Sequence, residues 1–184
     1  MKYEDFLKNK IVISEDFGFE VNESKMTSKL KPHQKDICLW ALKGGRRAVF
    51  ANFGLGKTFM QLEWASQVSE YTNRPVLLTC PLAVGAQTMK EAHKFGYGEN
   101  ISKWGTDNAI QVINYENLDK INFSDYAGIV LDESSILKNY EGAYRNLIID
   151  GFLNIPDKLA CTATPAPNDP MELGNHSEFL GAMS

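Results

Sequence analysis

A glycine-rich segment between an apolar run and a helix constrains the fold of this chain more than any other stretch. It reads Ala51-Asn52-Phe53-Gly54-Leu55-Gly56-Lys57-Thr58. Residues 48–50 before it are apolar, and residues 59–65 after it have helical character. In a loop of this kind, backbone N–H groups surround phosphate and the positive end of the following helix points at it. The segment therefore predicts a phosphate-binding loop, with a glycine-rich turn before an ordinary helix as the alternative.

Individual residues of this loop have expected roles. Lys57 would reach the outer phosphates of a nucleotide, and the Thr58 hydroxyl would hold Mg²⁺. The usual pattern begins with glycine, whereas Ala51 stands there, which is tolerable if its φ stays negative. The residues expected to contact the nucleotide in this loop are Gly54, Leu55, Gly56, Lys57 and Thr58.

Apolar runs and helical segments alternate along the rest of the chain. Strands are expected at 48–50, 75–80, 110–113, 128–131 and 158–161, and helices at 32–42, 58–70, 84–95 and 143–153. Short apolar strands separated by helices imply an α/β fold, in which a parallel sheet is covered on both faces. Residues 96–107, which include several Gly, Asn and Ser residues, are expected to form an exposed loop.

The composition is that of one soluble globular domain. Of the 184 residues, 43% are hydrophobic and 23% charged, and the net charge of −4 argues against a protein held to nucleic acid by bulk charge. The three cysteines are far apart and form no Cys-x-x-Cys pair, so neither zinc nor disulfides are expected. No apolar run reaches membrane-spanning length, and residues 1–7 do not resemble a secretory signal. These features favour the cytoplasm.

Two carboxylates follow the apolar run 128–131. Asp132 and Glu133 would lie at the carboxyl end of a parallel strand, where sheets of this kind bind ligands. Asp132 could hold Mg²⁺ through its water shell, and Glu133 could orient or deprotonate the water that attacks the γ-phosphate. The alternative is that both are turn residues or cap the next helix.

Five motifs in order resemble the N-terminal RecA-like lobe of superfamily 2 helicases, and most closely the Swi/Snf-type translocases and phage helicases. Besides the phosphate-binding loop, they are Leu30-Lys31-Pro32-His33-Gln34, Thr79-Cys80-Pro81-Leu82, Asp132-Glu133-Ser134-Ser135 with Leu137-Lys138-Asn139, and Cys161-Thr162-Ala163-Thr164-Pro165. The resemblance spans about residues 30–168. It implies a RecA-like P-loop domain with a parallel sheet, and a nucleic-acid-dependent ATPase that uses ATP and Mg²⁺ on DNA rather than RNA.

The resemblance also implies roles for single residues. Gln34 would read the adenine edge, because a side-chain amide both donates and accepts hydrogen bonds, and Phe17 or Phe19 would stack on the base. Thr162 and Thr164 would couple the nucleotide site to the nucleic-acid site. The residues expected to contact nucleic acid are Pro81, Gln87, Lys90, Asn114 and Tyr115.

Each of these residues also has an ordinary structural interpretation. Gln34 could be a surface glutamine of a helix, and Phe17 and Phe19 could be core aromatics. Thr162 and Thr164 could simply end a strand before a proline turn. The lysines at 25–35 and the pair Arg46-Arg47 could form a basic strip, or only a solvated face.

The sequence departs from the family at two places that affect function. Ser134-Ser135 stands where many relatives have Ala-His or Ala-Asp, which weakens any coupling through the fourth residue of that motif. Nothing after Pro170 resembles a second motor lobe, although in this family ATP is hydrolysed between two lobes and the second supplies arginine fingers. Such fingers contribute about 10³ to 10⁵ in rate, and no arginine here lies in a finger motif.

We therefore expect residues 1–29 to form an extension that could contribute to the adenine pocket, residues 30–169 to form an ATP-binding lobe, and residues 170–184 to begin a connection to a second lobe. That second lobe would be in the same full-length protein or act in trans. Two alternatives remain. The chain could be a stand-alone nucleotide-gated interaction module or competitor of a host helicase, or it could be a P-loop kinase of small molecules. The kinase leaves Gln34 and residues 162–165 unexplained.

Overall fold

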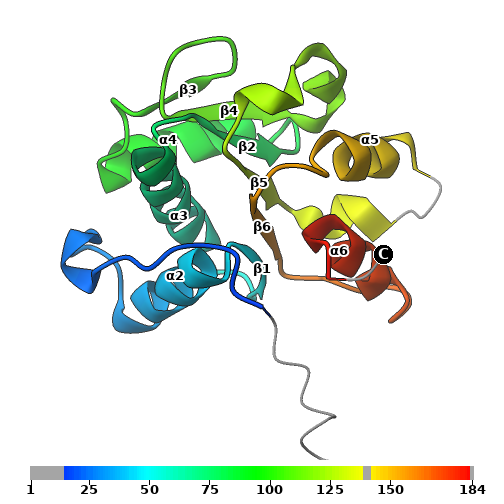
Figure 1. Ribbon diagram of the computed structural model, residues 1–184, viewed down its shortest axis with the longest axis horizontal. Helices are drawn as coiled ribbons and strands as arrows, with labels where there is room; N and C mark the ends of the chain where they lie inside the picture. Colours follow the sequence, from blue (N-terminus) through cyan, green and yellow to red (C-terminus); the bar gives the residue numbers. More distant parts are fainter. Residues whose placement is uncertain (1–14, 139–141, 183–184) are drawn as a thin grey trace, which may run out of the picture.

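A six-stranded parallel sheet forms the centre of the protein, with helices on both faces (Figure 1). The computed structural model describes residues 15–138 and 142–182. The strands, in spatial order, are β1 (Arg46–Phe50), β6 (Asp157–Thr162), β5 (Gly128–Asp132), β2 (Val76–Cys80), β4 (Ile110–Asn114) and β3 (Ile101–Lys103). All five neighbouring pairs are parallel. The predicted α/β RecA-like class is confirmed.

Helices of the first half of the chain cover one face of the sheet, and those of the second half cover the other. On the first face lie α2 (Pro32–Gly44), α3 (Lys57–Thr72) and α4 (Gly85–Phe95). On the second lie α5 (Ala143–Gly151), α6 (Glu172–Leu180) and the short 3₁₀ helices η2 (Tyr115–Lys120) and η4 (Ser134–Lys138). Two further 3₁₀ turns are η1 (Glu23–Lys25) and η3 (Phe123–Asp125).

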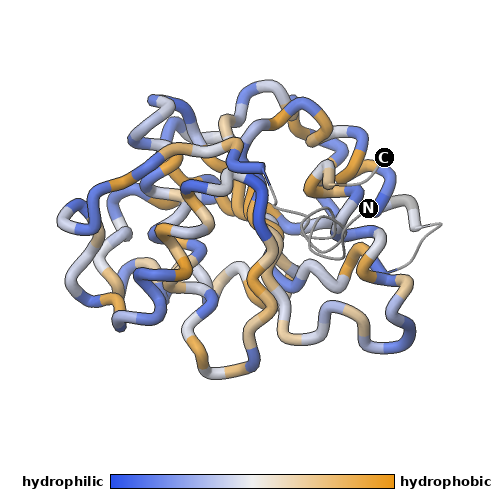
Figure 2. Tube along the Cα trace, turned by 60° about the horizontal axis from the view of Figure 1, so that its bottom comes forward, coloured by the Kyte–Doolittle hydropathy of each residue, from blue (hydrophilic) through white to orange (hydrophobic). Residues whose placement is uncertain are grey.

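The strands are apolar on both sides, as a sheet covered on both faces requires. Neighbouring residues such as Leu77 and Leu78 are both fully buried, but they belong to the apolar layers on opposite faces, because side chains alternate along a strand. Figure 2 shows the hydrophobic colour concentrated along the central strands. No helix within the described ranges is long and apolar enough to cross a membrane.

The expectation of a loop over residues 96–107 is wrong at its centre. Residues 101–103 form β3, which pairs with β4 in the register Ile101↔Ile110, and Ile101 is buried. A strand of three residues with one inward side chain is too short to produce a recognisable alternation. It forms because β4 offers an unpaired edge, which depends on the strand order.

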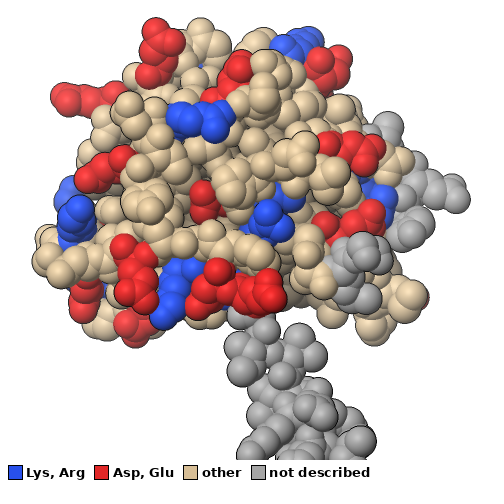
Figure 3. Space-filling model, viewed as in Figure 1, with Lys and Arg blue, Asp and Glu red and all other residues tan. Residues whose placement is uncertain are grey.

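The basic residues do not form a continuous strip. Lys35 pairs with Glu23 at 3.6 Å and Lys43 with Glu20 at 3.0 Å. Arg47 lies at the amino end of β1, where it bonds Asp16 at 2.7 Å. On the face shown in Figure 3, acidic and basic side chains are interspersed. Lys25, Lys29 and Lys31 are exposed, as the solvated-face interpretation expects, whereas Arg47 is buried and fits neither interpretation.

Two buried charges begin β6. Asp157 is buried, and its burial raises the pKa of the carboxyl to about 6, against the lowering influence of Arg46. Lys158 is also buried and donates to the Phe179 carbonyl at 2.9 Å, and burial lowers its pKa to about 8.

Replacing Asp157 by asparagine should change how stability depends on pH. The pKa of Asp157 is higher in the folded chain than the ordinary 3.8, so the native state binds this proton more tightly, and its stabilisation is lost as the pH rises from 4 towards 7. Relative to Asp157→Asn, the wild type should therefore lose about 2 kcal/mol of unfolding free energy between pH 4 and pH 7, at 1.36 kcal/mol per pKa unit. Urea unfolding at both pH values measures this. The exposed Asp119→Asn serves as control, and a difference that does not vary with pH would contradict the assignment.

Candidate nucleotide-binding site

The glycine-rich loop connects the carboxyl end of β1 to the amino end of α3. Gly54 and Gly56 have φ values of 77° and 79°, in the left-handed region that favours glycine. A Cβ at Gly56 would also lie 2.3 Å from Nε2 of Gln34, so a side chain there would displace that amide. The loop is fastened to the sheet where the Ala51 N–H donates to the Thr162 carbonyl at 3.1 Å. The strand–loop–helix arrangement predicted for the octapeptide is confirmed.

The Lys57 side chain folds back over this loop. Its Nζ donates to the carbonyl of Ala51 at 2.8 Å and to that of Asn52 at 3.4 Å, and it lies 5.2 Å from the centre of the Phe53 ring. No carboxylate is among these partners. An incoming phosphate, which carries full negative charge, would be a stronger acceptor for the ammonium than either carbonyl.

Asp132 ends β5 beside the loop and is 6% exposed. Gln61, one helical turn after Lys57 in α3, donates from Nε2 to Oδ1 of Asp132 at 2.8 Å. Burial raises the pKa of Asp132, while this hydrogen bond and the charge of Lys57 oppose the rise. The sequence interpretation did not identify Gln61. Its only signal was a polar residue on the buried side of a helix.

Glu133 has a left-handed backbone, with φ of 56°. Its Oε2 accepts a hydrogen bond from the Thr162 hydroxyl at 3.3 Å, and that hydroxyl in turn accepts one from the Thr164 N–H at 3.1 Å. The structure thus brings the 162–164 motif to the second carboxylate. Left-handed backbone costs a residue with a Cβ about 1–2 kcal/mol, and such strain persists only where surrounding contacts impose it.

Gln34 lies against the loop, buried at 5% exposure. Its Oε1 accepts from the Lys31 N–H at 3.0 Å and its Nε2 donates to the Leu55 carbonyl at 3.0 Å. The surface-glutamine interpretation is therefore wrong. The amide still has one hydrogen and one lone pair to offer, so its contact with adenine stays a prediction.

Phe17 and Phe19 do not lie beside Gln34. The Phe17 N–H donates to the Gly44 carbonyl at the far end of α2, about 15 Å along a helix that rises 1.5 Å per residue. Phe19 stacks on Tyr71 in the last turn of α3, with ring centres 3.8 Å apart. The expectation that either stacks on adenine is wrong in this arrangement, because the segment before α2 packs along the end of that helix opposite to the loop.

Four of the five residues expected to contact nucleic acid are exposed or line a groove. Gln87 and Lys90 are exposed on α4, and Gln87 donates to Glu91 at 2.9 Å. Asn114 lines a groove of about 370 Å³. The other residues of this groove are Leu82, Gly85, Ala86, Met89, Lys103, Trp104, Val112, Ile113 and Asn117. Pro81 lines a neighbouring groove of about 220 Å³ that also reaches Glu133.

Tyr115 is the exception among these residues. It is 3% exposed, and its hydroxyl donates to the Asp132 carbonyl at 2.7 Å. Its ring is part of the apolar layer beneath η2, so the side chain is not free to contact nucleic acid, and a contact through the backbone N–H at the start of η2 stays a prediction.

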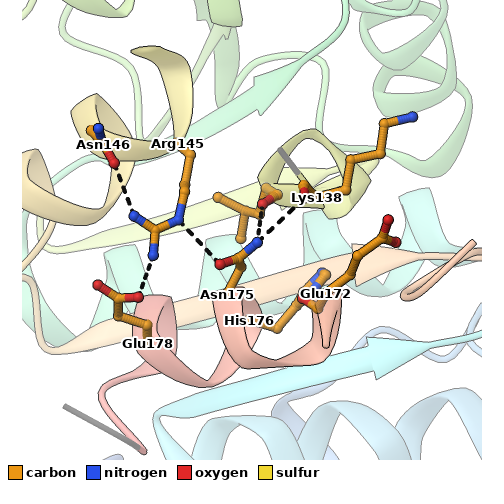
Figure 4. Close-up of polar contacts among 8 residues, drawn as sticks. Lys138, Arg145, Asn146, Glu172, Asn175, His176 and Glu178 are labelled. Atoms are coloured by element: carbon orange, nitrogen blue, oxygen red, sulfur yellow. Dashed lines mark hydrogen bonds and ion pairs between the residues drawn. The ribbon is translucent and has the colours of Figure 1, made fainter. Parts of the chain in front are cut away.

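Helix α6 holds η4, the segment that follows Glu133 (Figure 4). Nδ2 of Asn175 donates to the Leu137 carbonyl at 2.6 Å, and Oδ1 of Asn175 accepts from Nε of Arg145 at 3.1 Å. Arg145 also pairs with Glu178. Ser134 contributes a further contact, between its Oγ and Nε2 of His176 at 3.0 Å. Asn139, the last residue of the predicted motif, lies outside the described residues, as do residues 1–14 of the expected extension.

The residues around the loop fit Mg²⁺ with a nucleotide. Mg²⁺ is usually held by one or two carboxylates together with substrate phosphates, rather than by a full set of protein ligands. Across residues 15–138 and 142–182, no group of three or more His, Cys, Asp or Glu residues could hold a metal. One carboxylate of Asp132, joined through Gln61 to the helix that carries Thr58, suits that mode of binding.

Comparison with known proteins identifies similar chains. No protein-family model matches this chain. Among curated proteins, it is 26% identical over 174 residues to the SWI/SNF-related matrix-associated actin-dependent regulator of chromatin subfamily A-like protein 1 of Xenopus laevis. That alignment covers 86% of this chain and 18% of the Xenopus protein.

Solved helicase structures share the fold. The Sulfolobus solfataricus SWI2/SNF2 ATPase core in complex with dsDNA matches 88% of this chain and 37% of its own, with a TM-score of 0.73 and 21% identity. The UvsW helicase of bacteriophage T4 matches 97% of this chain and 66% of its own, with a TM-score of 0.70 and 17% identity. The Pyrococcus furiosus Hef helicase domain matches 83% of this chain and 36% of its own, with a TM-score of 0.66 and 16% identity. The expected resemblance to helicases of the Swi/Snf and phage types is confirmed in the fold, and the chain spans less than two thirds of each of these proteins.

Two substitutions of Glu133 should reveal its strained backbone. Glu133→Gly and Glu133→Ala both remove the carboxylate, so the two variants differ only in the Cβ. At a left-handed φ the Cβ is unfavourable by about 1 kcal/mol, so the Gly variant should be the more stable of the two by about that amount. Urea unfolding measures the difference.

The same pair of substitutions at Glu116 provides the control. Glu116 has no positive φ, so there the Ala variant should be more stable, as is usual within helices and strands. If Ala were also preferred at position 133, the strain would be absent.

Proposed function

We propose that this chain is the ATP-binding lobe of a nucleic-acid-dependent ATPase, which uses Mg-ATP to move on or remodel DNA. One observation carries the proposal. The loop with Lys57 and Thr58 and the strand end with Asp132 and Glu133 lie together, joined by the 2.8 Å bond from Gln61 to Asp132. That combination suits phosphoryl transfer, in which catalysis consists of positioning and electrostatic stabilisation.

Different residues would bind the phosphates, hold the metal and activate the water. The N–H groups of residues 54–58 would bind phosphate oxygens, and the Lys57 ammonium would leave the loop carbonyls for the outer phosphates. Thr58 and Asp132 would hold Mg²⁺, which when bound neutralises charge on the phosphates. Glu133 would orient the attacking water or accept its proton. Thr162, hydrogen-bonded to Glu133, would couple changes at this carboxylate to the nucleic-acid site.

DNA is the proposed nucleic acid. The support is the likeness in fold to a Swi/Snf-type core whose structure contains dsDNA, together with the exposed residues Gln87 and Lys90 and the groove beside Asn114. Because the net charge is −4, binding would depend on local contacts to the phosphate backbone, which carry little sequence information. Cys38, Cys80 and Cys161 are buried free thiols, which suits a reducing compartment, and we place the protein in the cytoplasm.

Hydrolysis should be slow without a second lobe. All four arginines of the chain have structural partners away from the loop. Arg46 bonds the Pro156 carbonyl, Arg47 bonds Asp16, Arg74 bonds the Tyr126 carbonyl, and Arg145 bonds Asn175. An arginine finger for the transition state would therefore come from a second RecA-like lobe, in the same full-length protein or in trans.

Replacing Lys57 by alanine should abolish Mg-ATP binding, because it removes the ammonium that lies on the loop carbonyls at the predicted phosphate site. Calorimetry or a fluorescent ATP analogue measures the affinity, and wild type should bind weakly but detectably. Lys43→Ala provides the control, since Lys43 lies at the far end of α2 and pairs with Glu20. Unchanged affinity in Lys57→Ala would contradict the proposed site.

The purified wild-type chain should hydrolyse Mg-ATP very slowly, and single- or double-stranded DNA alone should not restore rapid turnover. A steady-state phosphate-release assay measures this. Turnover at a rate of several per second without any partner would contradict the requirement for a second lobe.

A further inference from the structure

Tyr115 joins two strand ends that are not neighbours in the sheet. It follows Asn114, the last residue of β4, and its hydroxyl reaches the carbonyl of Asp132, the last residue of β5. In the strand order, β2 lies between β4 and β5. The ring therefore crosses the carboxyl end of β2, within the apolar layer that also contains Ile113 and Leu131.

The Tyr115 hydroxyl acts as a hydrogen-bond donor to the Asp132 carbonyl. Burial raises the pKa of Tyr115 well above its usual value, so the hydroxyl keeps its proton. At 2.7 Å the bond to the Asp132 carbonyl has the length of a well-formed O–H···O hydrogen bond. A buried phenol without such a partner would be unfavourable.

That carbonyl belongs to the peptide between the two functional carboxylates. A peptide plane can rotate by about 180° between two turn geometries, which changes ψ of the residue before it and φ of the residue after it. At this peptide the rotation would take Glu133 out of its left-handed φ of 56° and turn the Asp132 oxygen away from Tyr115. The phenol therefore favours the one orientation in which the Glu133 carboxylate meets Thr162.

We propose that Tyr115 is a positioning residue for ATP hydrolysis, because its hydroxyl selects the orientation of the Asp132–Glu133 peptide and so the place of the Glu133 carboxylate. The effect of Tyr115 on the rate of hydrolysis rests on the proposed function. Its effect on the orientation of the Asp132–Glu133 peptide does not. It also gives Tyr115 a role other than nucleic-acid contact.

Tyr126 offers a matched control. It is a second buried tyrosine in the same apolar layer, and its hydroxyl bonds Oε1 of Gln111 at 3.1 Å. Tyr115→Phe and Tyr126→Phe each remove one buried phenol hydroxyl. Only the first removes a contact to the Asp132–Glu133 peptide.

Hydrogen exchange tests the structural part on the 184-residue chain without nucleotide. In Tyr115→Phe, amide exchange in the segment 131–138 should be at least tenfold faster than in wild type, while α3 keeps its protection. In Tyr126→Phe the segment 131–138 should exchange as in wild type. Equal exchange of this segment in both variants would overturn the inference, whatever the affinity of the chain for nucleotide.

Single-turnover hydrolysis, with protein in excess over ATP, tests the catalytic part. Tyr115→Phe should bind Mg-ATP within twofold of wild type but hydrolyse it at least tenfold more slowly, whereas Tyr126→Phe should match wild type in both. Equal rates in the two variants would overturn the positioning role. A wild-type chain that bound no Mg-ATP would instead overturn the proposed function. The exchange experiment would still test whether the Tyr115 hydroxyl orients the Asp132–Glu133 peptide.

Discussion

The candidate site depends on the register of three neighbouring parallel strands. β1 pairs with β6 so that Phe50 is opposite Thr162, and β6 pairs with β5 so that Cys161 is opposite Asp132. In a parallel sheet all carboxyl ends lie at one edge. This register therefore brings the start of the glycine-rich loop, Thr162 and the first carboxylate to neighbouring positions, although they are far apart in the chain.

The peptide between Asp132 and Glu133 is fixed from several directions. Gln61 bonds the Asp132 carboxylate from α3, Tyr115 bonds the carbonyl from beyond β4, and Thr162 bonds the Glu133 carboxylate from β6. Ser134 is held by His176 of α6. Each contact is modest alone, since a typical hydrogen bond contributes about 1 kcal/mol. Together they can offset the left-handed backbone of Glu133, a strain of the kind found at functional sites.

Much of this arrangement could be predicted from sequence, because its elements follow local rules. The glycine pattern before Lys57 specifies the loop, and an apolar run before Asp132 specifies a strand end. The contacts between elements could not be predicted in this way. Tyr115 reaches Asp132 across β2, and Gln61 faces Asp132, only because of the strand order and the rotation of α3. The position of Phe17 beside the carboxyl end of α2 could not be predicted for the same reason. No local sequence pattern indicates which end of a helix the preceding segment packs against.

The central claim is that this edge of the sheet binds a magnesium nucleotide between the loop and Asp132. A crystal structure of the chain with Mg²⁺ and a non-hydrolysable ATP analogue tests it most directly. The account predicts that the Lys57 ammonium leaves the Ala51 and Asn52 carbonyls for the outer phosphates, and that the metal lies between Thr58 and Asp132. An analogue bound elsewhere, or bound here with Lys57 still on the loop carbonyls, would contradict it.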